Sequence, residues 1–550
     1  MHEFAIRGGT VIDGTGACGR KADIGISGGR IREIAPTVAG RSELDASGQL
    51  VVPGFIDLHT HYDPQVLWDP RLAASSVHGV TSVVAGNCGF SLAPVKPSGR
   101  EILIGTLDKV EDMNAATLQA GIDWDFETYP EYLEAVERRG LGINFGGFVG
   151  HTAVRAYVMG EASYERPATD AEIAAMKAVV AESIRGGALG FSTDRAGFIL
   201  GHRGRPVPSV VATQDETEAL MRVTAEIGRG IVHVAPGEDY RWLFPFQRSL
   251  GRTVNWSALL TYPPDSGRGP FREKLAALEE ARRGGADIWA QVTCRPILQL
   301  ISLLEPYSFS YIPAFAEVIG APRSERGRFY TNAAWRARVK AELARGNLLP
   351  PRWNLITIAE SDTHAMLIGK SIAELSSERG AAPFDAMCDI ALEDHMRTRF
   401  GVVFANDDED GIRDLLCGSG CILGLSDAGA HVAQICDAVL STDFLASWVR
   451  DRGVMSIEAG IHKLTGEPAR VLGIDRGTLR VGAPADIVVL DLDALAVGPV
   501  RRVCDMPAEG ERLIADLPGG ITHVLVNGTP IRRDGTPIHD ARPGTILRSC

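Results

Sequence analysis

The sequence lacks the charge pattern of a protein that binds nucleic acid or an anionic membrane. Its 550 residues carry 56 Lys and Arg against 69 Asp and Glu, a formal net charge of −13, and like charges never form a run of five or six. A basic patch or tail is the usual footprint of such partners. We therefore expect no nucleic acid and no membrane among the partners of this chain.

Long apolar runs are also missing. The sequence has no run of eighteen apolar residues, and its N-terminus has no basic segment followed by an apolar one. Those patterns mark membrane spans and export signals, so we predict a cytoplasmic protein. The content of 45% apolar and 23% charged residues is that of a globular chain with a sizeable core. The oligomeric state stays open, and a homo-oligomer is compatible with this composition.

The cysteines do not form the pattern of a disulfide framework. Nine of them, an odd number, are scattered from Cys18 to Cys550 without CxxC spacing. In a long chain without an export signal, such cysteines are expected to be reduced thiols. Only Cys88 calls for a separate explanation, because Gly86 and Gly89 flank it closely.

Both ends of the chain have a β-rich pattern. Apolar residues alternate with polar ones and glycine pairs interrupt them at 3–16 and 22–36, and again at 477–491 and 520–538. The last segment contains Asn527-Gly528, a strong hairpin signal. We predict that residues 1–55 and 477–550 pair into one small β-sandwich domain.

Between these ends, short apolar runs alternate with stretches of helical character. This alternation predicts βα units around a buried parallel sheet, which is the α/β class. Eight runs are the number that a (β/α)8 TIM-type barrel needs, and we assign that barrel to 56–476. A long, aromatic-rich connection predicts an insertion within about 295–400. The eight predicted strands are 51–59, 81–87, 143–150, 187–193, 230–235, 253–260, 286–292 and 421–427.

Polar residues at the ends of these runs are the candidates for chemistry, because the active site of such a barrel forms at the C-terminal ends of its strands. The first run ends in His59-Thr60-His61. Side chains alternate along a strand, so both imidazoles lie on one face and can reach one metal ion. An isolated pair of this kind is more often structural or solvated. Its position directly after a strand favours the metal site.

Cys88 and Asp427 extend this set. The glycines around Cys88 predict a tight bend that aims its sulfur, and a thiolate is a good ligand for zinc. The alternative for Cys88 is a small apolar residue of the core. Asp427 ends the eighth run, where a carboxylate beside a metal can bind the ion and act as general base. The alternative for Asp427 is a helix cap.

Two further histidines lie near predicted strand ends. His151 ends the third run, and His202 follows the fourth. Each is interpreted either as a polar wall of the pocket or as a participant in catalysis. We retain His151 as a candidate catalytic residue and His202 as a candidate substrate contact.

Several segments together resemble the amidohydrolase superfamily and, within it, the N-acyl-D-amino acid deacylase branch. The first and fourth are typical of the superfamily, and the GNCGFS type within the second points to the branch. They cover nearly the whole chain in the expected order. The segments are VVPGFIDLHTHYDP (51–64), GVTSVVAGNCGFSLAP (79–94), GFSTDR with GRPVPS (190–209), GLSDAGAH (424–431) and the tail 464–491.

The resemblance implies a (β/α)8 barrel with a β-sandwich, and one or two divalent ions, expected to be Zn²⁺. It assigns His59 and His61 to one metal and His233 to the second metal position. Asp427 would be both metal ligand and catalytic base. Cys88 would replace the carboxylated lysine that bridges two metals in many relatives, which fits the absence of lysine in GFSTD (190–194).

The chain also departs from this branch. Its members usually carry Ser-His-x-Lys at the sixth strand, the His for zinc and the Lys for the substrate carboxylate, whereas Ala258 and Leu260 stand here. The usual His-Pro-Arg after the eighth strand is missing as well. Either other cationic residues bind the carboxylate, or the substrate is an amide with a neutral or bulky amine side. The candidate substrate contacts are Arg155, Arg195, His202 and Arg203.

We therefore predict a metal-dependent hydrolase that cleaves a carboxamide bond of a small molecule. Metal-activated water would attack, with Asp427 as general base and acid. The substrate is expected to be an N-acyl amino acid or a related amide without a free carboxylate. The same site would also serve a cyclic amide, a lactone or an ester. A non-catalytic scaffold is a further interpretation, because fold alone does not fix function.

Overall fold

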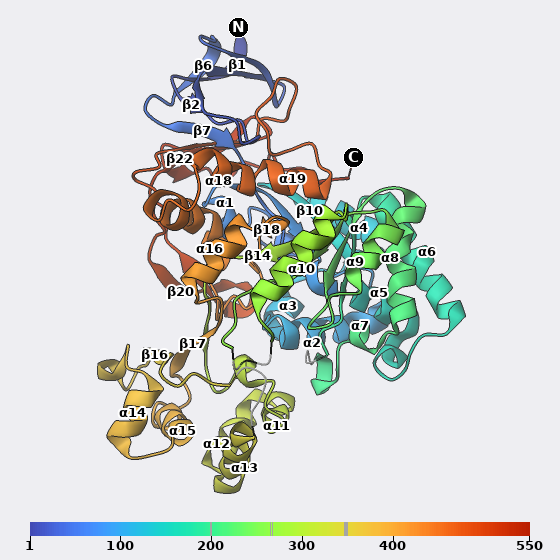
Figure 1. Cartoon of the computed structure of the whole chain (residues 1–550), viewed down its shortest axis with the longest axis vertical. Helices are drawn as coiled ribbons and strands as arrows, with labels where there is room; N and C mark the ends of the chain where they lie inside the picture. The colour runs from blue at the N-terminus through green and yellow to red at the C-terminus, as the bar shows by residue number, and fades with distance from the viewer. Residues whose placement is uncertain (198–200, 265, 267, 346–349, 550) are drawn as a thin grey trace.

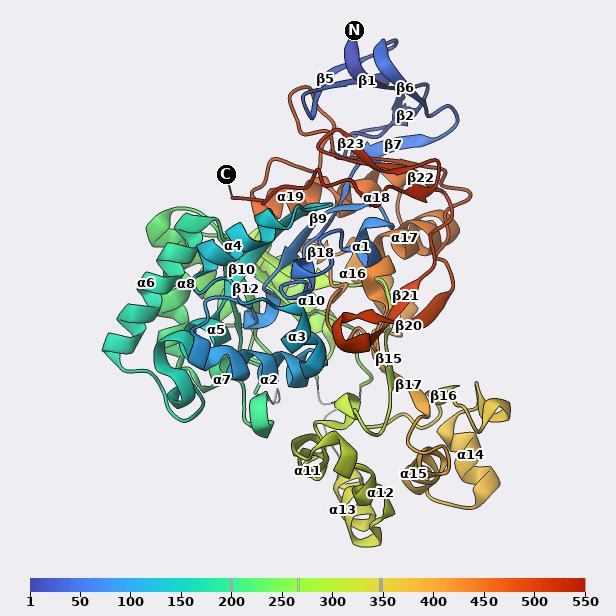
Figure 2. The same ribbon diagram turned by 180° about the vertical axis from the view of Figure 1, so that it is seen from behind.

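The computed structural model describes residues 1–197, 201–264, 266, 268–345 and 350–549. Figure 1 and Figure 2 show three parts along the long axis of the molecule. A β lobe with the N-terminus lies at one end, a barrel lies in the middle, and a helical insertion lies at the opposite end.

The barrel is built from eight parallel strands in the order β18-β14-β13-β12-β11-β10-β9-β8. A parallel bridge between Thr60 and Ala428 joins the segments that follow the two edge strands and closes the ring. Every predicted strand range overlaps one of these strands, so the predicted α/β class and TIM-type barrel are confirmed. The strands are β8 (Phe55–Asp57), β9 (Val80–Ala85), β10 (Asn144–Gly150), β11 (Gly190–Asp194), β12 (Ile231–Ala235), β13 (Val254–Trp256), β14 (Ile288–Val292) and β18 (Cys421–Leu423).

Helices surround these strands on the outside. One of them, Asp170–Gly186, begins at a capping box formed by Thr169 and Glu172 and buries Met176, Val180 and Ile184. The helices of the barrel are α1 (Ala73–Ser76), α2 (Arg100–Val110), α3 (Ala115–Gly121), α4 (Tyr129–Arg138), α5 (His151–Met159), α6 (Asp170–Gly186), α7 (Pro208–Val211), α8 (Gln214–Ile227), α9 (Leu243–Leu250), α10 (Phe271–Arg283), α16 (Glu409–Cys417), α17 (Leu440–Asp443), α18 (Ile457–Leu464) and α19 (Gly466–Leu472).

The β lobe combines both ends of the chain, as predicted. A seven-stranded sheet has the order β24-β23-β22-β19-β7-β2-β3, and a four-stranded sheet has the order β5-β4-β1-β6. A shared core joins Ile6 and Val51 to Ile487 and Leu525. The strands are β1 (His2–Arg7), β2 (Thr10–Val11), β3 (Arg20–Lys21), β4 (Asp23–Ser27), β5 (Arg30–Ala35), β6 (Gly40–Asp45), β7 (Leu50–Pro53), β19 (Ile487–Leu490), β22 (Ile521–Val526), β23 (Thr529–Arg533) and β24 (Thr536–Pro537).

Asn527 and Gly528 connect β22 to β23, which confirms the hairpin expected there. The exact division of the chain into 1–55, 56–476 and 477–550 stays a prediction.

The insertion has a sheet and a core of its own. Three antiparallel strands in the order β15-β17-β16 pack with helices around a separate apolar cluster that includes Phe315 and Trp335. Ion pairs from Arg399 to Glu511 and from Arg502 to Glu360 link the insertion to a neighbouring hairpin. The elements are β15 (Ile297–Ile301), α11 (Phe315–Gly320), α12 (Gly327–Thr331), α13 (Ala333–Ala344), β16 (Ile356–Glu360), α14 (Ile372–Arg379), α15 (Pro383–Glu393) and β17 (Arg399–Ala405), and the hairpin is β20 (Val500–Met506) with β21 (Gly510–Ala515).

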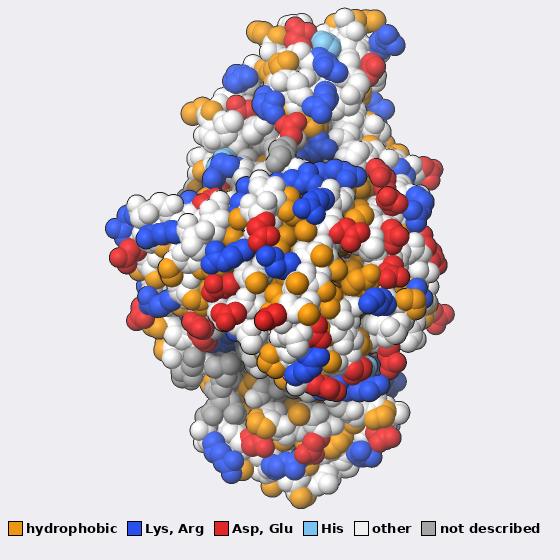
Figure 3. Space-filling model, turned by 90° about the vertical axis from the view of Figure 1, so that its right-hand side faces the viewer, with side chains coloured by type: hydrophobic (Ala, Val, Ile, Leu, Met, Phe, Trp, Pro, Cys, Tyr) orange, Lys and Arg blue, Asp and Glu red, His pale blue; other side chains and the backbone are white. Residues whose placement is uncertain are grey.

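The described cysteines are free thiols, as expected, and Cys550 lies outside the described residues. Within the described ranges, no helix has both the length and the apolar character needed to cross a membrane. On the face that Figure 3 shows, basic and acidic side chains are interspersed over the barrel and the insertion.

Candidate metal centre

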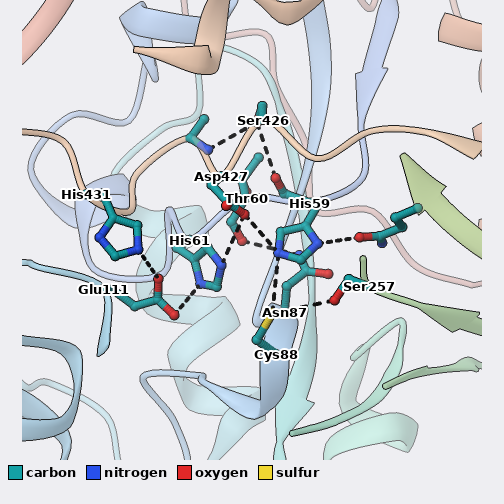
Figure 4. Close-up of polar contacts among 12 residues, drawn as sticks. His59, Thr60, His61, Asn87, Cys88, Glu111, Ser257, Ser426, Asp427 and His431 are labelled. Carbon is teal, nitrogen blue, oxygen red and sulfur yellow. Dashed lines mark hydrogen bonds and ion pairs between the residues drawn. The ribbon is translucent and has the colours of Figure 1, made fainter. Parts of the chain in front are cut away.

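Four predicted site residues converge where the barrel strands end (Figure 4). His59 and His61 follow β8, Cys88 follows β9, and Asp427 follows β18. His59 Nε2 lies 3.1 Å from Asp427 Oδ1 and 3.5 Å from Cys88 Sγ. His61 Nε2 lies 3.8 Å from the same Asp427 oxygen. Strands that are far apart in the sequence thus bring imidazole, thiol and carboxylate together.

These distances are those between ligands of one ion. Around a tetrahedral zinc ion, neighbouring nitrogen ligands lie ~3.3 Å apart, and nitrogen and sulfur ligands lie ~3.6 Å apart. The ligand atoms of His59, His61 and Cys88 all lie within 4.8 Å of one another. The donors present, two imidazoles, a thiol and a carboxylate, are also those that zinc prefers. The residues therefore fit a divalent cation of this kind.

The backbone holds two of these residues in the left-handed region. Cys88 has φ 52° and Asp427 has φ 47°, values that are uncommon outside glycine and that cluster at functional sites. Gly86, at φ 72°, makes the turn before Cys88, and a Cβ there would lie 2.2 Å from the carbonyl oxygen of Phe148. The turn that aims Cys88 therefore requires glycine at position 86.

Burial controls the charges of the site. Only 1% of His59 and 3% of His61 are exposed, whereas 30% of the Asp427 side chain is exposed. Burial lowers the pKa of His59 to about 4 and raises the pKa of Asp427 to about 7. Burial, with the charges of Glu111, Asp194 and Asp427, raises the pKa of Cys88 well above its usual value. Neutral histidines suit a cation, and a cation favours the ionised carboxylate and thiolate.

His233, the fifth predicted ligand, also lies beside Cys88, and its ring centroid is 5.3 Å from that of His59. Its Nε2 is 4.0 Å from Cys88 Sγ and 3.2 Å from Ser257 Oγ. Ser257 Oγ is also 3.8 Å from Cys88 Sγ. This half of the centre therefore consists of one imidazole and one hydroxyl next to the sulfur.

An apolar wall adjoins the same side. Leu260 packs with Leu425, which lies two residues before Asp427, and with Ala405 of the insertion. Ala258, directly after Ser257, packs on this cluster, as do Tyr262, Ile297 and Phe404. The two positions where the resemblance placed His and Lys therefore belong to an apolar cluster.

Sequence reasoning missed several residues around the centre. Asp194 ends β11, is 1% exposed and has its pKa raised to about 8 by burial. Glu111 follows α2, and His431 lies in the loop after β18. Gln291 Oε1, from β14, is in close contact with His59 Nδ1. The strand-end position of Asp194 was a usable signal, whereas nothing local marks Glu111.

The structure does not bring His151 and Arg155 to this centre. Along β11, Ser192 faces the Cys88 turn, where its Oγ contacts Gly86 O and Gly89 N. Thr193, the next residue, points to the opposite side and hydrogen-bonds His151 Nδ1 at 2.8 Å. His151 therefore lies behind the strand, outside the barrel mouth.

Arg155 belongs to the same outer network. It is fully buried, and it binds Glu216 through Nη1 and the carbonyl oxygens of Ser163 and Arg166 through Nη2. His151 Nε2 lies 3.2 Å from the same Glu216 carboxylate. Arg155 is fully buried in this network, and its predicted contact with a substrate carboxylate stays a prediction.

The remaining predicted substrate contacts face other groups. Arg195 donates to the carbonyl oxygen of Ala212 at 2.8 Å and to Thr217 Oγ1 at 3.2 Å. The Arg203 side chain is 64% exposed and pairs with Glu101. His202 packs on α2, where a Cβ on Gly105 would overlap its ring. Among the described contacts of Arg195, His202 and Arg203, none reaches the candidate ligands His59, His61, Cys88 and Asp427, and their role toward substrate stays a prediction.

Comparison with known proteins extends over the whole chain. A family model described as the amidohydrolase family matches residues 42–532. The N-acyl-D-glutamate deacylase of Alcaligenes xylosoxydans xylosoxydans is 30% identical over 560 residues, covering 99% of this chain and 96% of the relative.

Two solved structures are similar over their full length. The crystal structure of N-acyl-D-glutamate deacylase from Bordetella bronchiseptica, complexed with zinc and a phosphonate mimic of the tetrahedral intermediate, is 28% identical with a TM-score of 0.70. A D-aminoacylase structure, described by one-metal activation and second-metal attenuation in a binuclear centre, is 25% identical with a TM-score of 0.69. In both cases 100% of each chain is covered.

Proposed function

This chain belongs to the amidohydrolase family, and on that premise we propose that it hydrolyses the carboxamide bond of a small N-acyl compound in a metal-dependent reaction. The observation that carries this proposal is the convergence of His59, His61, Cys88 and Asp427 at ligand-to-ligand distances in the barrel mouth. Zinc is the ion that best suits this donor set.

Each residue has a distinct part in the proposed reaction. A divalent cation, when bound, supplies a Lewis acid that polarises the carbonyl and activates water near neutral pH. His59, His61 and Cys88 hold the ion, and His233 offers a ligand beyond Cys88 for a second one. Asp427, whose side chain is 30% exposed, takes the proton from the attacking water through its carboxylate and delivers it to the amide nitrogen.

We further propose that the amine side of the substrate is neutral and apolar rather than a free amino acid. Leu260, Leu425 and Ala405 form an apolar wall beside Ser257 and Asp427. A carboxylate placed on this wall would lose its hydration without gaining a charge-assisted hydrogen bond, each worth about 1.5–3 kcal/mol. The relatives named above are N-acyl-D-glutamate deacylases and a D-aminoacylase. An apolar wall at this place would change which substrate is preferred, while the type of bond that is cleaved stays the same.

A matched substrate pair tests this function. Purified protein loaded with zinc is assayed on N-acetyl-D-leucine and on its primary amide, which differ only in the carboxylate. We expect kcat/KM to be about tenfold or more higher for the neutral compound. Leu260→Lys should reverse the preference, whereas Leu260→Met, which adds no charge, should keep it. No hydrolysis of any acyl amide with zinc bound would contradict the proposed reaction, and an unchanged preference in Leu260→Lys would contradict the role of the wall.

A further inference from the structure

The outer nitrogens of the two paired histidines have different partners. His59 Nδ1 is in close contact with the neutral amide of Gln291. His61 Nδ1 faces a carboxylate instead, with Glu111 Oε1 at 3.4 Å (Figure 4). Within the described structure, this buried nitrogen has no hydrogen-bond partner closer than that carboxylate. The side of His61 that faces away from Asp427 is therefore aimed at Glu111.

Glu111 is held in place by the loop that carries Asp427. Its side chain is 6% exposed, and its second oxygen lies 4.0 Å from His431 Nε2. The backbone N–H of His431 donates to the carbonyl oxygen of Glu111 at 2.6 Å. Gly429, at φ 96°, lets this loop approach His61, because a Cβ there would lie 2.8 Å from the His61 backbone. Glu111, His61 and the loop thus form one packed unit.

No lysine or arginine pairs with Glu111 in the described part of the chain, where its ion-pair contacts are His61 and His431. Burying a carboxylate without a basic partner costs free energy unless the carboxylate accepts hydrogen bonds or interacts with a bound cation. A histidine that binds a metal through one nitrogen normally donates the other N–H to a carboxylate, carbonyl or water, which fixes its orientation and strengthens it as a ligand.

We propose that Glu111 is a positioning residue, which accepts a hydrogen bond from His61 Nδ1–H and so directs His61 Nε2 at the metal. The proposal rests on the metal-dependent function proposed above. The distance of 3.4 Å requires a shift of only about 0.5 Å to reach hydrogen-bond length. The two histidines then differ in what orients them: the amide oxygen of Gln291 for His59, and a carboxylate oxygen of Glu111 for His61.

Metal affinity tests this role without relying on turnover. Zinc dissociation constants are measured by chelator competition for the full chain, for Glu111→Ala and for Glu111→Gln. Asp112→Asn is the matched control, because Asp112 is the neighbouring carboxylate and is bound by Gln434 on another side. We expect Glu111→Ala to weaken zinc binding about 10- to 100-fold. Glu111→Gln keeps an acceptor oxygen but not the carboxylate, so its zinc affinity should lie between those of the parent and Glu111→Ala. Asp112→Asn should bind zinc as tightly as the parent does.

The spectrum of the cobalt-substituted protein adds a second readout, because a reoriented His61 changes the ligand field at the ion. Glu111→Ala should change it and Glu111→Gln should largely restore it. Equal affinity in the parent and both Glu111 variants, or an equal loss in Asp112→Asn, would overturn the positioning role while leaving metal binding intact. A parent chain that binds no divalent ion would instead overturn the proposed function itself.

Discussion

Two buried clusters of histidine and carboxylate lie on opposite sides of the same barrel strand, and they differ in how their charges are balanced. Behind β11, Glu216 is bound by Arg155 and by His151, whose other nitrogen is bound by Thr193. All of these side chains except Thr193 carry a charge or a titratable ring, and the arginine supplies the positive charge that the carboxylate needs.

The cluster in the barrel mouth has no such cation. Glu111 and Asp427 face His59, His61 and the Cys88 thiol, and no lysine or arginine of the described chain pairs with either carboxylate. Asp427 is also open to solvent on one side. A closed network whose charges are balanced contributes to the stability of the fold. A cluster of carboxylates and imidazoles without a lysine or arginine partner in the described chain, and open to solvent at Asp427, is instead suited to bind a metal cation. The comparison separates His151, on the outer face of β11, from His59 and His61, the candidate ligands.

Asp427→Asn should have the largest effect on activity, and this effect should be confined to the cluster in the barrel mouth. Removing the general base is expected to lower kcat/KM roughly 10²- to 10⁴-fold. His59, His61 and Cys88 should still retain the metal, so metal content and the free energy of unfolding should change little. Steady-state kinetics with elemental analysis measures both. Asp475→Asn, at an exposed carboxylate, is the control, and activity within about threefold of the parent in Asp427→Asn would remove Asp427 from the reaction.

Glu216→Gln should show the opposite pattern. It leaves the buried Arg155 without a carboxylate partner, so the free energy of unfolding should fall by about 3–5 kcal/mol. Zinc affinity of the folded protein should stay unchanged. Denaturant unfolding measures the first quantity and chelator competition the second.

Glu226→Gln is the matched control on the same helix, α8, because Glu226 is 54% exposed in its ion pair with Lys177. Glu226→Gln should lower the free energy of unfolding by less than about 1 kcal/mol. Loss of zinc affinity in Glu216→Gln at full stability would mean that the outer network belongs to the catalytic site after all.

The smallest expected effect concerns pH. Burial lowers the pKa of His151 from its usual 6.5, so the folded protein keeps this ring neutral at pH values where the unfolded chain binds a proton. Its contribution to stability is therefore complete above pH 6.5 and is lost as the pH falls toward the lower pKa of the folded state. His151→Asn should reduce the slope of unfolding free energy against pH below 6.5 by at most about 1.4 kcal/mol per pH unit.

Denaturant titrations at several pH values measure this slope. His395→Asn, at an exposed histidine, should leave it unchanged. An identical slope in the parent and in His151→Asn would show that His151 does not remain neutral in the folded protein.

The barrel and the resemblance to amidohydrolases were accessible from the sequence because their signals are local. Short apolar runs mark the strands, and His59-Thr60-His61, Cys88 and Asp427 stand directly at strand ends. The match to the amidohydrolase family confirms the resemblance. The hairpin at Asn527-Gly528 was equally local, since two residues decide its turn.

His151 shows where this reasoning fails. It follows β10 directly, as a site residue should, but it begins helix α5 and its ring turns to the outer face of β11. Arg155, one helical turn later, follows it into the same outer network. Distance along the chain from a strand end did not reveal which side of the neighbouring strand each side chain would reach.

The barrel strands, the pairing of both ends in one β lobe, and His59, His61, Cys88 and Asp427 as candidate metal ligands could all be predicted from the sequence alone. These follow from side-chain periodicity and from residue types that only certain chemistry requires. That Glu111 lies beside His61, that Ser257 lies beside His233, and that Arg155 binds Glu216 could be seen only in the folded chain. Those contacts join segments far apart in the chain, and their partners are chosen by packing and by the balance of buried charge.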